Sequence, residues 1–372
     1  LSQAITPSTT PAGVALTVRY NTSTNAPVNA GIYAVTAEVV DTNSYFGTPA
    51  TGSLIVDKAS SSIVSAPTAS GITYGQTLAD STLSGGSGSV AGSFAFTTPT
   101  TAPNAGTANQ GITFTPTDST NYSTASGSVS VVVAKASTSI TSSPSASGIT
   151  FGQTLADSTL TGGSGSVSGS FAFTTPSTAP NAGTADQDVT FTPDDASNYN
   201  SASGVASVTV AKATPSIISA PSASGITYGQ TLADSTLAGG TASTAGSFAF
   251  TSPSTSPNAG TADQDVTFTP DDASNYNSAS GTASVTVAKA TPSIISAPSA
   301  SAITAGQTLA DSMLSGGSGS VAGSFAFTYP SATPSVGTAD QSVTFTPTDT
   351  NNYNNATTLV SVTVNSASTP AE

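Results

Sequence analysis

A six-residue string, Gly-Gln-Thr-Leu-Ala-Asp, recurs at a fixed interval along this chain of 372 residues. It begins at Gly75, Gly152, Gly229 and Gly306, 77 residues apart each time. A fixed internal period indicates that each copy is one structural unit repeated in series. We therefore divide the chain into four repeats, preceded by a shorter unit and followed by a polar tail. The boundaries are 1–58 for the short unit, 59–135, 136–212, 213–289 and 290–365 for the repeats, and 366–372 for the tail.

Within each repeat the apolar residues alternate with a period of two, which is typical of β-strands. In the first repeat these positions are Phe94, Phe96, Ile112, Phe114, Val129, Val131 and Val133. Runs rich in Gly, Ser, Asn and Pro separate them and supply turns. Short strands with frequent turns predict an all-β fold, a tandem array of small antiparallel Ig-like β-sandwich modules.

The joints between repeats are short, which predicts that the array is an elongated rod. Residues 133–137 lead from one repeat into the next without a glycine, and Pro215 and Pro292 fix φ in two later joints. At the rise of an extended strand each module would be about 35–40 Å long, and the whole rod on the order of 170 Å.

The short unit at 1–58 parallels only the later part of each repeat, so we expect it to be a truncated module that lacks its first strand. Such a gap would leave an unpaired sheet edge, and these edges recruit strands from other chains. The predicted partners are therefore copies of the chain itself, joined head to tail by strand donation to this module. The competing interpretation is a chain cut within a longer array.

The short unit also carries a family resemblance. Residues 29–37, Asp41 with Tyr45, and residues 54–59 resemble bacterial MBG-type modules. The four longer units are similar to the Ig-like repeats that accompany such modules, through Ile72-Thr73-Tyr74-Gly75-Gln76 and Asn121-Tyr122. This resemblance implies a large secreted or surface protein of adhesin or filament character, without catalytic residues. One departure is Ala305, where the other repeats have Tyr74, Phe151 and Tyr228.

Composition excludes several classes of function. The net charge is −14 with only five basic residues, which disfavours nucleic acid and anionic membrane surfaces. No apolar run reaches the ~18 residues of a spanning helix, so we expect no membrane insertion. Histidine and cysteine are absent, which removes the usual base of a serine nucleophile and all cysteine chemistry. We therefore expect no enzyme activity and no catalytic residue.

Acidic residues gather in the second and third repeats and suggest one candidate metal site. They are Asp186, Asp188, Asp194 and Asp195, and again Asp263, Asp265, Asp271 and Asp272. Calcium prefers six to eight oxygen ligands of this kind. The two pairs in each group would lie at opposite ends of a strand, about 16–20 Å apart, which favours solvated surface charge. We expect no cofactor, with calcium at these aspartates as the alternative.

Each repeat also has an aspartate four residues before a tyrosine. The pairs are Asp118 and Tyr122, Asp195 and Tyr199, Asp272 and Tyr276, and Asp349 and Tyr353. The spacing is similar to a tyrosine corner, in which the tyrosine hydroxyl bonds to the backbone. Asp at a turn start commonly caps its own loop. We predict structural turn locks at these positions.

One lysine recurs at each joint: Lys58, Lys135, Lys212 and Lys289. One hypothesis pairs each lysine with a nearby aspartate, such as Lys58 with Asp80 or Lys135 with Asp157, setting the joint angle. A second is an intramolecular Lys–Asn isopeptide bond, which requires a buried lysine.

These features together predict an extracellular structural protein of a bacterial cell surface, a stalk or filament that spaces or polymerises through stiff β-sandwich repeats. The alternative is an adhesin whose Ig-like modules bind a ligand or glycan.

Overall fold

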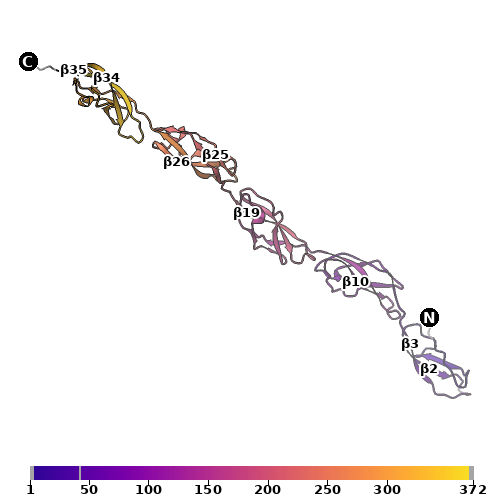
Figure 1. Ribbon diagram of the computed structural model, residues 1–372. Helices are drawn as coiled ribbons and strands as arrows, with labels where there is room; N and C mark the ends of the chain where they lie inside the picture. Colours follow the sequence, from indigo (N-terminus) through magenta and orange to yellow (C-terminus); the bar gives the residue numbers. More distant parts are fainter. Residues whose placement is uncertain (1–3, 42, 368–372) are drawn as a thin grey trace, which may run out of the picture. The chain divides into compact units, whose positions relative to one another are not determined.

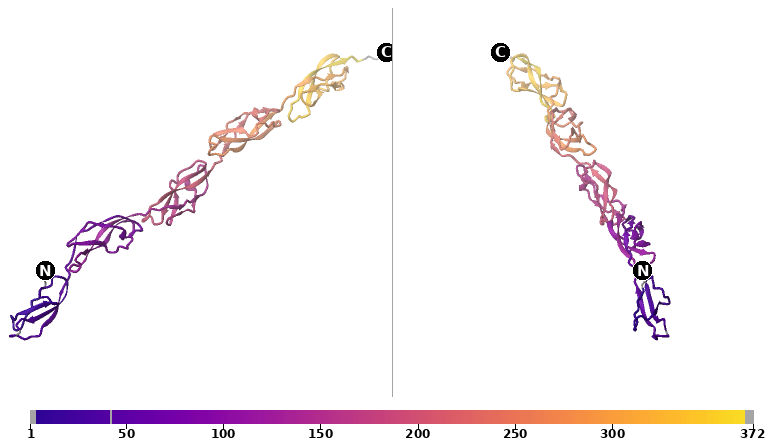
Figure 2. Two further views of the ribbon diagram at one scale, coloured as in Figure 1. Left: turned by 180° about the vertical axis from the view of Figure 1, so that it is seen from behind. Right: turned by 90° about the vertical axis from the view of Figure 1, so that its right-hand side faces the viewer.

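The computed structural model describes residues 4–41 and 43–367. Most of the polar tail, residues 368–372, lies outside the described residues. The short N-terminal unit has three strands, β1 (Leu16–Tyr20), β2 (Gly31–Val39) and β3 (Ala50–Val56). They form one antiparallel sheet in that order, drawn in indigo in Figure 2. We call this unit the N-terminal module.

Each repeat has eight strands and one three-residue 3₁₀ turn. In the first repeat these are β4 (Ile63–Ser65), β5 (Thr68–Ala69), β6 (Ile72–Thr73), η1 (Leu78–Asp80), β7 (Leu83–Ser84), β8 (Ser87–Gly88), β9 (Gly92–Phe96), β10 (Gly106–Pro116) and β11 (Ala125–Ala134). In the second they are β12 (Ile140–Ser142), β13 (Ser145–Ala146), β14 (Ile149–Thr150), η2 (Leu155–Asp157), β15 (Leu160–Thr161), β16 (Ser164–Gly165), β17 (Gly169–Phe173), β18 (Gly183–Pro193) and β19 (Ala202–Ala211).

The third repeat has β20 (Ile217–Ser219), β21 (Ser222–Ala223), β22 (Ile226–Thr227), η3 (Leu232–Asp234), β23 (Leu237–Ala238), β24 (Thr241–Ala242), β25 (Gly246–Phe250), β26 (Gly260–Pro270) and β27 (Ala279–Ala288). The fourth has β28 (Ile294–Ser296), β29 (Ser299–Ala300), β30 (Ile303–Thr304), η4 (Leu309–Asp311), β31 (Leu314–Ser315), β32 (Ser318–Gly319), β33 (Gly323–Phe327), β34 (Gly337–Pro347) and β35 (Ala356–Asn365).

One four-stranded sheet forms the base of the first repeat, in the order β6-β11-β10-β9. Strands β9, β10 and β11 pair antiparallel, with Phe114 opposite Phe94. Strand β6 pairs with β11 in parallel, which departs from the predicted antiparallel pattern. The third and fourth repeats have the same sheet order, and Figure 1 labels β25 and β26 of the third repeat and β34 and β35 of the fourth.

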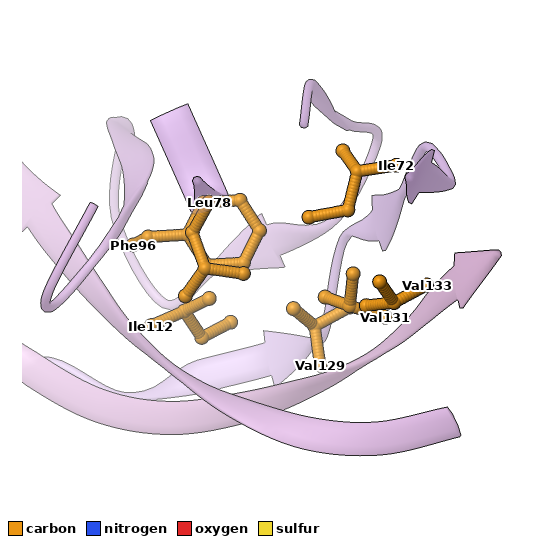
Figure 3. Packing of buried hydrophobic residues seen from close by; sticks show 7 residues of the cluster. All are labelled: Ile72, Leu78, Phe96, Ile112, Val129, Val131 and Val133. Carbon is orange, nitrogen blue, oxygen red and sulfur yellow. The ribbon is translucent and has the colours of Figure 1, made fainter. Parts of the chain in front are cut away.

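Two short antiparallel strand pairs, β4 with β8 and β5 with β7, cover the inner face of this sheet. Ile63, Ala69 and Leu83 of these strands pack against the buried cluster drawn in Figure 3. That cluster consists of Ile72, Leu78, Phe96, Ile112, Val129, Val131 and Val133. Alternation along each strand thus places apolar side chains inward, and the 3₁₀ turn adds Leu78, which is fully buried. The third and fourth repeats have equivalent buried clusters.

The N-terminal module contains only the sheet, without the covering strand pairs. Among its described apolar side chains Tyr20, Pro27 and Val35 are buried, while Leu54 and Val56 are half-buried. Strand β3 occupies the place that β11 has in the first repeat, since Gly31 faces Val56 as Gly106 faces Val133. Among the described residues β3 pairs with β2 alone, so the position that β6 fills in the repeat has no strand here.

By its contacts the chain divides into two compact units, and the division runs through the second repeat. Residues 147–158, 177–185 and those from 208 onward belong to the second unit, and the rest to the first. The contacts described below each join residues of one unit.

Candidate functional site: the joints between modules

A turn at one end of each repeat brings together the recurring aspartate and tyrosine. In the first repeat the Tyr122 amide donates to the Asp118 carbonyl at 3.2 Å. The Asp118 carboxylate accepts from the Asn121 amide at 3.1 Å and from Asn121 Nδ2 at 2.7 Å. The side chain that locks this turn is therefore Asn121, which the sequence marked only as part of the family resemblance and not as a turn lock. No described tyrosine of this set uses its hydroxyl as a tyrosine corner would, and Tyr122 contributes its backbone amide.

The same turn recurs in the other repeats. Asn198, Asn275 and Asn352 each donate through Nδ2 to the preceding aspartate at 2.8 Å. Hydrogen bonds hold the pKa of three of these carboxyls below the usual range. The largest cause is the Asn121 side chain at Asp118, the Ser197 hydroxyl at Asp195 and the Ser274 hydroxyl at Asp272. These hydrogen bonds to Asp118, Asp195 and Asp272 favour the ionised carboxylate, which is a stronger acceptor than a neutral group.

The joint lysines bind the carbonyl groups of this turn. Lys58 Nζ donates to the Ser119 carbonyl at 2.6 Å and Lys135 Nζ to the Ala196 carbonyl at 2.5 Å. Lys212 and Lys289 do the same with Ala273 and Thr350, at 2.6 and 2.7 Å.

The predicted Lys58–Asp80 and Lys135–Asp157 pairs are wrong. The Asp80 carboxylate is used within its own turn, where it accepts from the Thr77 amide at 2.8 Å, and Asp157 likewise accepts from Thr154. The charge of Lys58 instead helps to lower the pKa of Asp118. All four lysines are exposed, which also removes the burial that an isopeptide bond would need.

The residue after each lysine ties the linker to the same turn. The Ala59 amide donates to the Asn121 carbonyl at 2.8 Å, and the Ser123 amide donates to the Ala59 carbonyl at 2.9 Å. Ala136, Ala213 and Ala290 form the same parallel bridge with Tyr199, Tyr276 and Tyr353. Each linker is thus bridged to the turn through the backbone of its alanine.

The asparagine of the turn also reaches the preceding module. Asn198 Oδ1 accepts from the Ala105 amide at 2.8 Å, across 93 residues of sequence. The equivalent bonds join Asn121 to Ala30, Asn275 to Ala182 and Asn352 to Ala259, each at 2.8 Å. Asn198, Asn275 and Asn352 are only 6–7% exposed, so these bonds are shielded from water. An unpaired amide buried there would cost about 1–3 kcal/mol.

Aromatic rings meet across three of the joints. Tyr199 packs edge-on against Tyr74 of the preceding repeat, with ring centroids 5.3 Å apart and planes at 79°. Tyr276 meets Phe151, and Tyr353 meets Tyr228, with the same separation. Edge-to-face pairs of this kind contribute about 0.5–1.5 kcal/mol beyond burial.

Each joint therefore has two complementary halves. We call the Asp, Asn and Tyr of the turn the plug, for example Asp349, Asn352 and Tyr353. We call the ring and the Asn-Ala pair that meet it the socket, for example Tyr228, Asn258 and Ala259. The joint between the N-terminal module and the first repeat has the hydrogen bond that the Ala30 amide donates to Asn121. Among the described residues, however, no ring of the N-terminal module packs on Tyr122.

The acidic groups of the second and third repeats do not converge. Asp186 and Asp188 are exposed on β18, and Asp263 and Asp265 are exposed on β26. Asp195 and Asp272 are engaged in the plugs, and Asp194 and Asp271 are exposed beside them. Among residues 4–41 and 43–367 no three acidic side chains gather as a metal-binding group. Nothing in the geometry supports the calcium alternative.

The concave surfaces of the repeats are open grooves without reactive groups. In the first repeat a groove of about 710 Å³ lies along the segment 83–94 and is lined mainly by glycine and serine and by the side chains of Phe94 and Phe114. The second repeat has a similar groove of about 690 Å³, with Asp194 at its edge. In the part of the chain that is described, no helix is long and apolar enough to cross a membrane.

Residues 1–60 match the family of the MBG domain, which agrees with the resemblance drawn from the N-terminal unit. No curated protein matches the chain. Among solved structures, Sidekick-1 immunoglobulin domains 1-5 align with 95% of this chain and 92% of their own, at 9% identity and a TM-score of 0.24. The titin I-band fragment I67-I69 aligns with 61% and 98%, at 11% identity and a TM-score of 0.27. Drosophila N-cadherin EC1-4 aligns with 70% and 84%, at 10% identity and a TM-score of 0.22. These scores are too low to carry a structural argument, so the fold stands on the chain's own strand pairing.

The regular spacing of the asparagines in the sequence is a signal for the socket and the plug, although the chemistry of asparagine does not by itself indicate that role. Asn121, Asn198, Asn275 and Asn352 keep the 77-residue register as strictly as the lysines do. The Asn-Ala-Gly string recurs at Asn104, Asn181 and Asn258. An exposed asparagine in a loop is usually a turn former, so its second role became apparent only when the neighbouring module was in place.

Proposed function

We propose, starting from an MBG domain followed by four Ig-like repeats, that this chain is an extracellular structural protein of a bacterial surface. It acts as a stalk or filament segment that holds its two ends apart. The observation that carries this proposal is the joint. The backbone bridge and the hydrogen bond from the turn asparagine to the preceding module recur at all four joints, and a ring pair is added at three of them.

The test is a distance measurement on a cell surface. The chain is displayed with an epitope at its far end, together with versions that carry one, two or three repeats. A spacer raises the epitope by about 35–40 Å for each repeat, measured by fluorescence localisation normal to the membrane. A height that does not depend on repeat number would contradict the proposal.

An adhesin is the second candidate, and the fourth repeat favours it. Met313, Tyr329 and Leu359 are 76%, 66% and 61% exposed, where the first repeat has Thr82, Thr98 and Ser128. Apolar side chains that gather into one exposed patch mark contact surfaces, and the adhesin proposal requires that these three side chains act together in this way. A glycan array and cell-binding assay with the full chain, beside a Met313→Thr, Tyr329→Thr and Leu359→Ser variant, would separate adhesin from spacer.

Filament growth by strand donation is a third, dependent proposal. The open edge of β3 could accept a strand in parallel, as β11 accepts β6 in the first repeat, with an isoleucine opposite Val56. A labelled peptide of residues 71–80 should then bind the full chain, and the same peptide with Ile72→Asp should not. Equal binding of the two peptides, or none, would exclude strand donation.

A further inference from the structure

The fourth repeat departs from the others at its socket. Ala305 stands where Tyr74, Phe151 and Tyr228 supply the ring, and Ser335-Val336 stands where the others have Asn-Ala. The plug of the same repeat is intact, since Asn352 Oδ1 accepts from Ala259 at 2.8 Å and Tyr353 packs on Tyr228. The departure is therefore confined to one end of the module.

Each departure removes or obstructs a specific contact. Alanine at 305 leaves no ring for an incoming tyrosine to meet. Serine at 335 has a shorter hydroxyl in place of the carboxamide whose oxygen Asn258 presents to Asn352 Nδ2 at 3.4 Å. Val336 places a larger, β-branched side chain, 57% exposed, at the position whose amide would be shielded in a joint.

The core of the fourth repeat shows no matching change. Its buried cluster contains Ile303, Leu309, Phe327, Val343 and three valines of β35, equivalent to the cluster of the first repeat. Ala305 packs against this cluster as Tyr74 packs against its own. These substitutions leave the core unchanged and alter only the surface that meets the next module. They therefore affect docking and not folding.

We infer that the ring and the Asn-Ala pair form a docking code for the plug of a following repeat, and that the fourth repeat does not carry it. A module with the Asp-x-x-Asn-Tyr plug docks rigidly after the first, second or third repeat. It does not dock rigidly after the fourth, whose far end is either a boundary of the stiff array or a hinge. This inference concerns joint specificity and does not depend on the proposed surface function.

The first test transfers the fourth repeat's residues into a working joint of the full chain. Because the chain has no cysteine, Ser284→Cys and Ser361→Cys place one spin label on each of the third and fourth repeats at exposed strand positions. Tyr228→Ala, Asn258→Ser and Ala259→Val are then introduced together. We expect the distance distribution from electron–electron double resonance to broaden. Removal of the ring pair by itself should raise the undocked population about 2- to 10-fold.

The matched control puts the reverse changes, Ala305→Tyr, Ser335→Asn and Val336→Ala, in the same labelled chain. They lie outside this joint and should leave the distribution narrow. An unchanged width in the transferred variant, with melting temperature equal to that of the parent, would overturn the docking code.

The second test asks whether the code is sufficient. A copy of residues 289–365 is fused after Asn365, so that the linker keeps its length and its lysine, and ¹⁵N relaxation compares its tumbling with that of its neighbour. In the parent sequence the added copy should reorient independently, and in the Ala305→Tyr, Ser335→Asn, Val336→Ala background it should tumble with the fourth repeat. Rigid coupling in both chains would show that Ala305, Ser335 and Val336 do not decide docking, and independent motion in both would show that the code is insufficient.

Discussion

The N-terminal module and the first repeat contain equivalent hairpins, but the side chains of the two hairpins are buried to very different extents. Strands β2 and β3 pair in the register of β10 and β11, yet Val39 is half-buried where the equivalent Phe114 is 1% exposed. The repeat gains its core from the segment at 63–88, whose two short antiparallel strand pairs and 3₁₀ turn cover the sheet. The comparison shows that the sheet supplies a platform, and that the covering layer supplies most of the burial.

The largest expected effect comes from removing the central side chain of the covered sheet. Phe114→Ala should destabilise the first repeat by about 3–5 kcal/mol, as buried aromatic truncations do. Val39→Ala, at the equivalent site of the N-terminal module, should cost about 1 kcal/mol because the side chain is half-buried. Native-state hydrogen exchange on peptides unique to each module measures both. Equal losses would mean that the N-terminal module is covered in solution.

A second prediction concerns the glycines that let the covering strand pairs approach the sheet. A Cβ at Gly88 would overlap the ring of Phe114, whereas a Cβ at Gly52 of the N-terminal module meets nothing within 4 Å. Gly88→Ala should therefore cost about 1–3 kcal/mol through overpacking, and Gly52→Ala should be neutral within about 0.5 kcal/mol. Thermal unfolding followed by calorimetry provides the comparison. A neutral Gly88→Ala would mean that the covering strands shift to accept the methyl group.

Acidification should affect the joint through the Asp118 loop of the first repeat and not through the Asp41 loop of the N-terminal module. Hydrogen bonds lower the pKa of Asp118, chiefly from the Asn121 side chain, and the pKa of Asp41, chiefly from the Ser44 hydroxyl. A lowered folded pKa contributes stability that is present above the unfolded value of about 3.9 and is lost as pH falls through the folded pKa.

The measurement is an NMR titration from neutral pH to below the folded pKa of each carboxyl. The Ala30 amide, which donates to Asn121 Oδ1, should shift with the protonation of Asp118 and not with that of Asp41. If the chemical shift of the Ala30 amide stayed constant while Asp118 is protonated, the turn would have no influence on the joint.

The smallest effect is expected at the joint lysines. Lys58→Met and Lys135→Met each remove one exposed donor to a turn carbonyl, a change of about 0–1 kcal/mol. Lys58→Met should have the greater effect, since its joint lacks the ring pair that Tyr74 and Tyr199 provide beside Lys135. Hydrogen exchange at Ala30 and Ala105 reports the two joints. A larger loss at Lys135 would reverse this order.

Much of the fold could be predicted from the sequence because the signals are local and repeated. Alternating apolar residues such as Ile112 and Phe114 specify a strand and its inward face without reference to other strands. The parallel pairing of β6 with β11 could not be predicted in this way, because Ile72 reads as an inward residue in either strand direction. Its partner depends on where the chain returns after the 3₁₀ turn.

The contacts at the joints differ from the predicted ones. Lys58 binds the Ser119 carbonyl instead of Asp80, and Tyr199 uses its ring instead of its hydroxyl. A lysine near several aspartates has many plausible partners at surface dielectric, and their energies differ by less than about 1 kcal/mol. Only the backbone path of the turn determines which oxygen lies within reach.

By itself the sequence determined the period, the strands, the inward faces and the absence of histidine and cysteine chemistry, since these follow from residue type and order. The tertiary structure decided which residues of different modules meet. Ala105 and Asn198 are 93 residues apart in sequence, and no local rule links a backbone amide to an asparagine at that separation. Their contact exists because two closed cores present their ends to each other, so it could be found only after each core had formed.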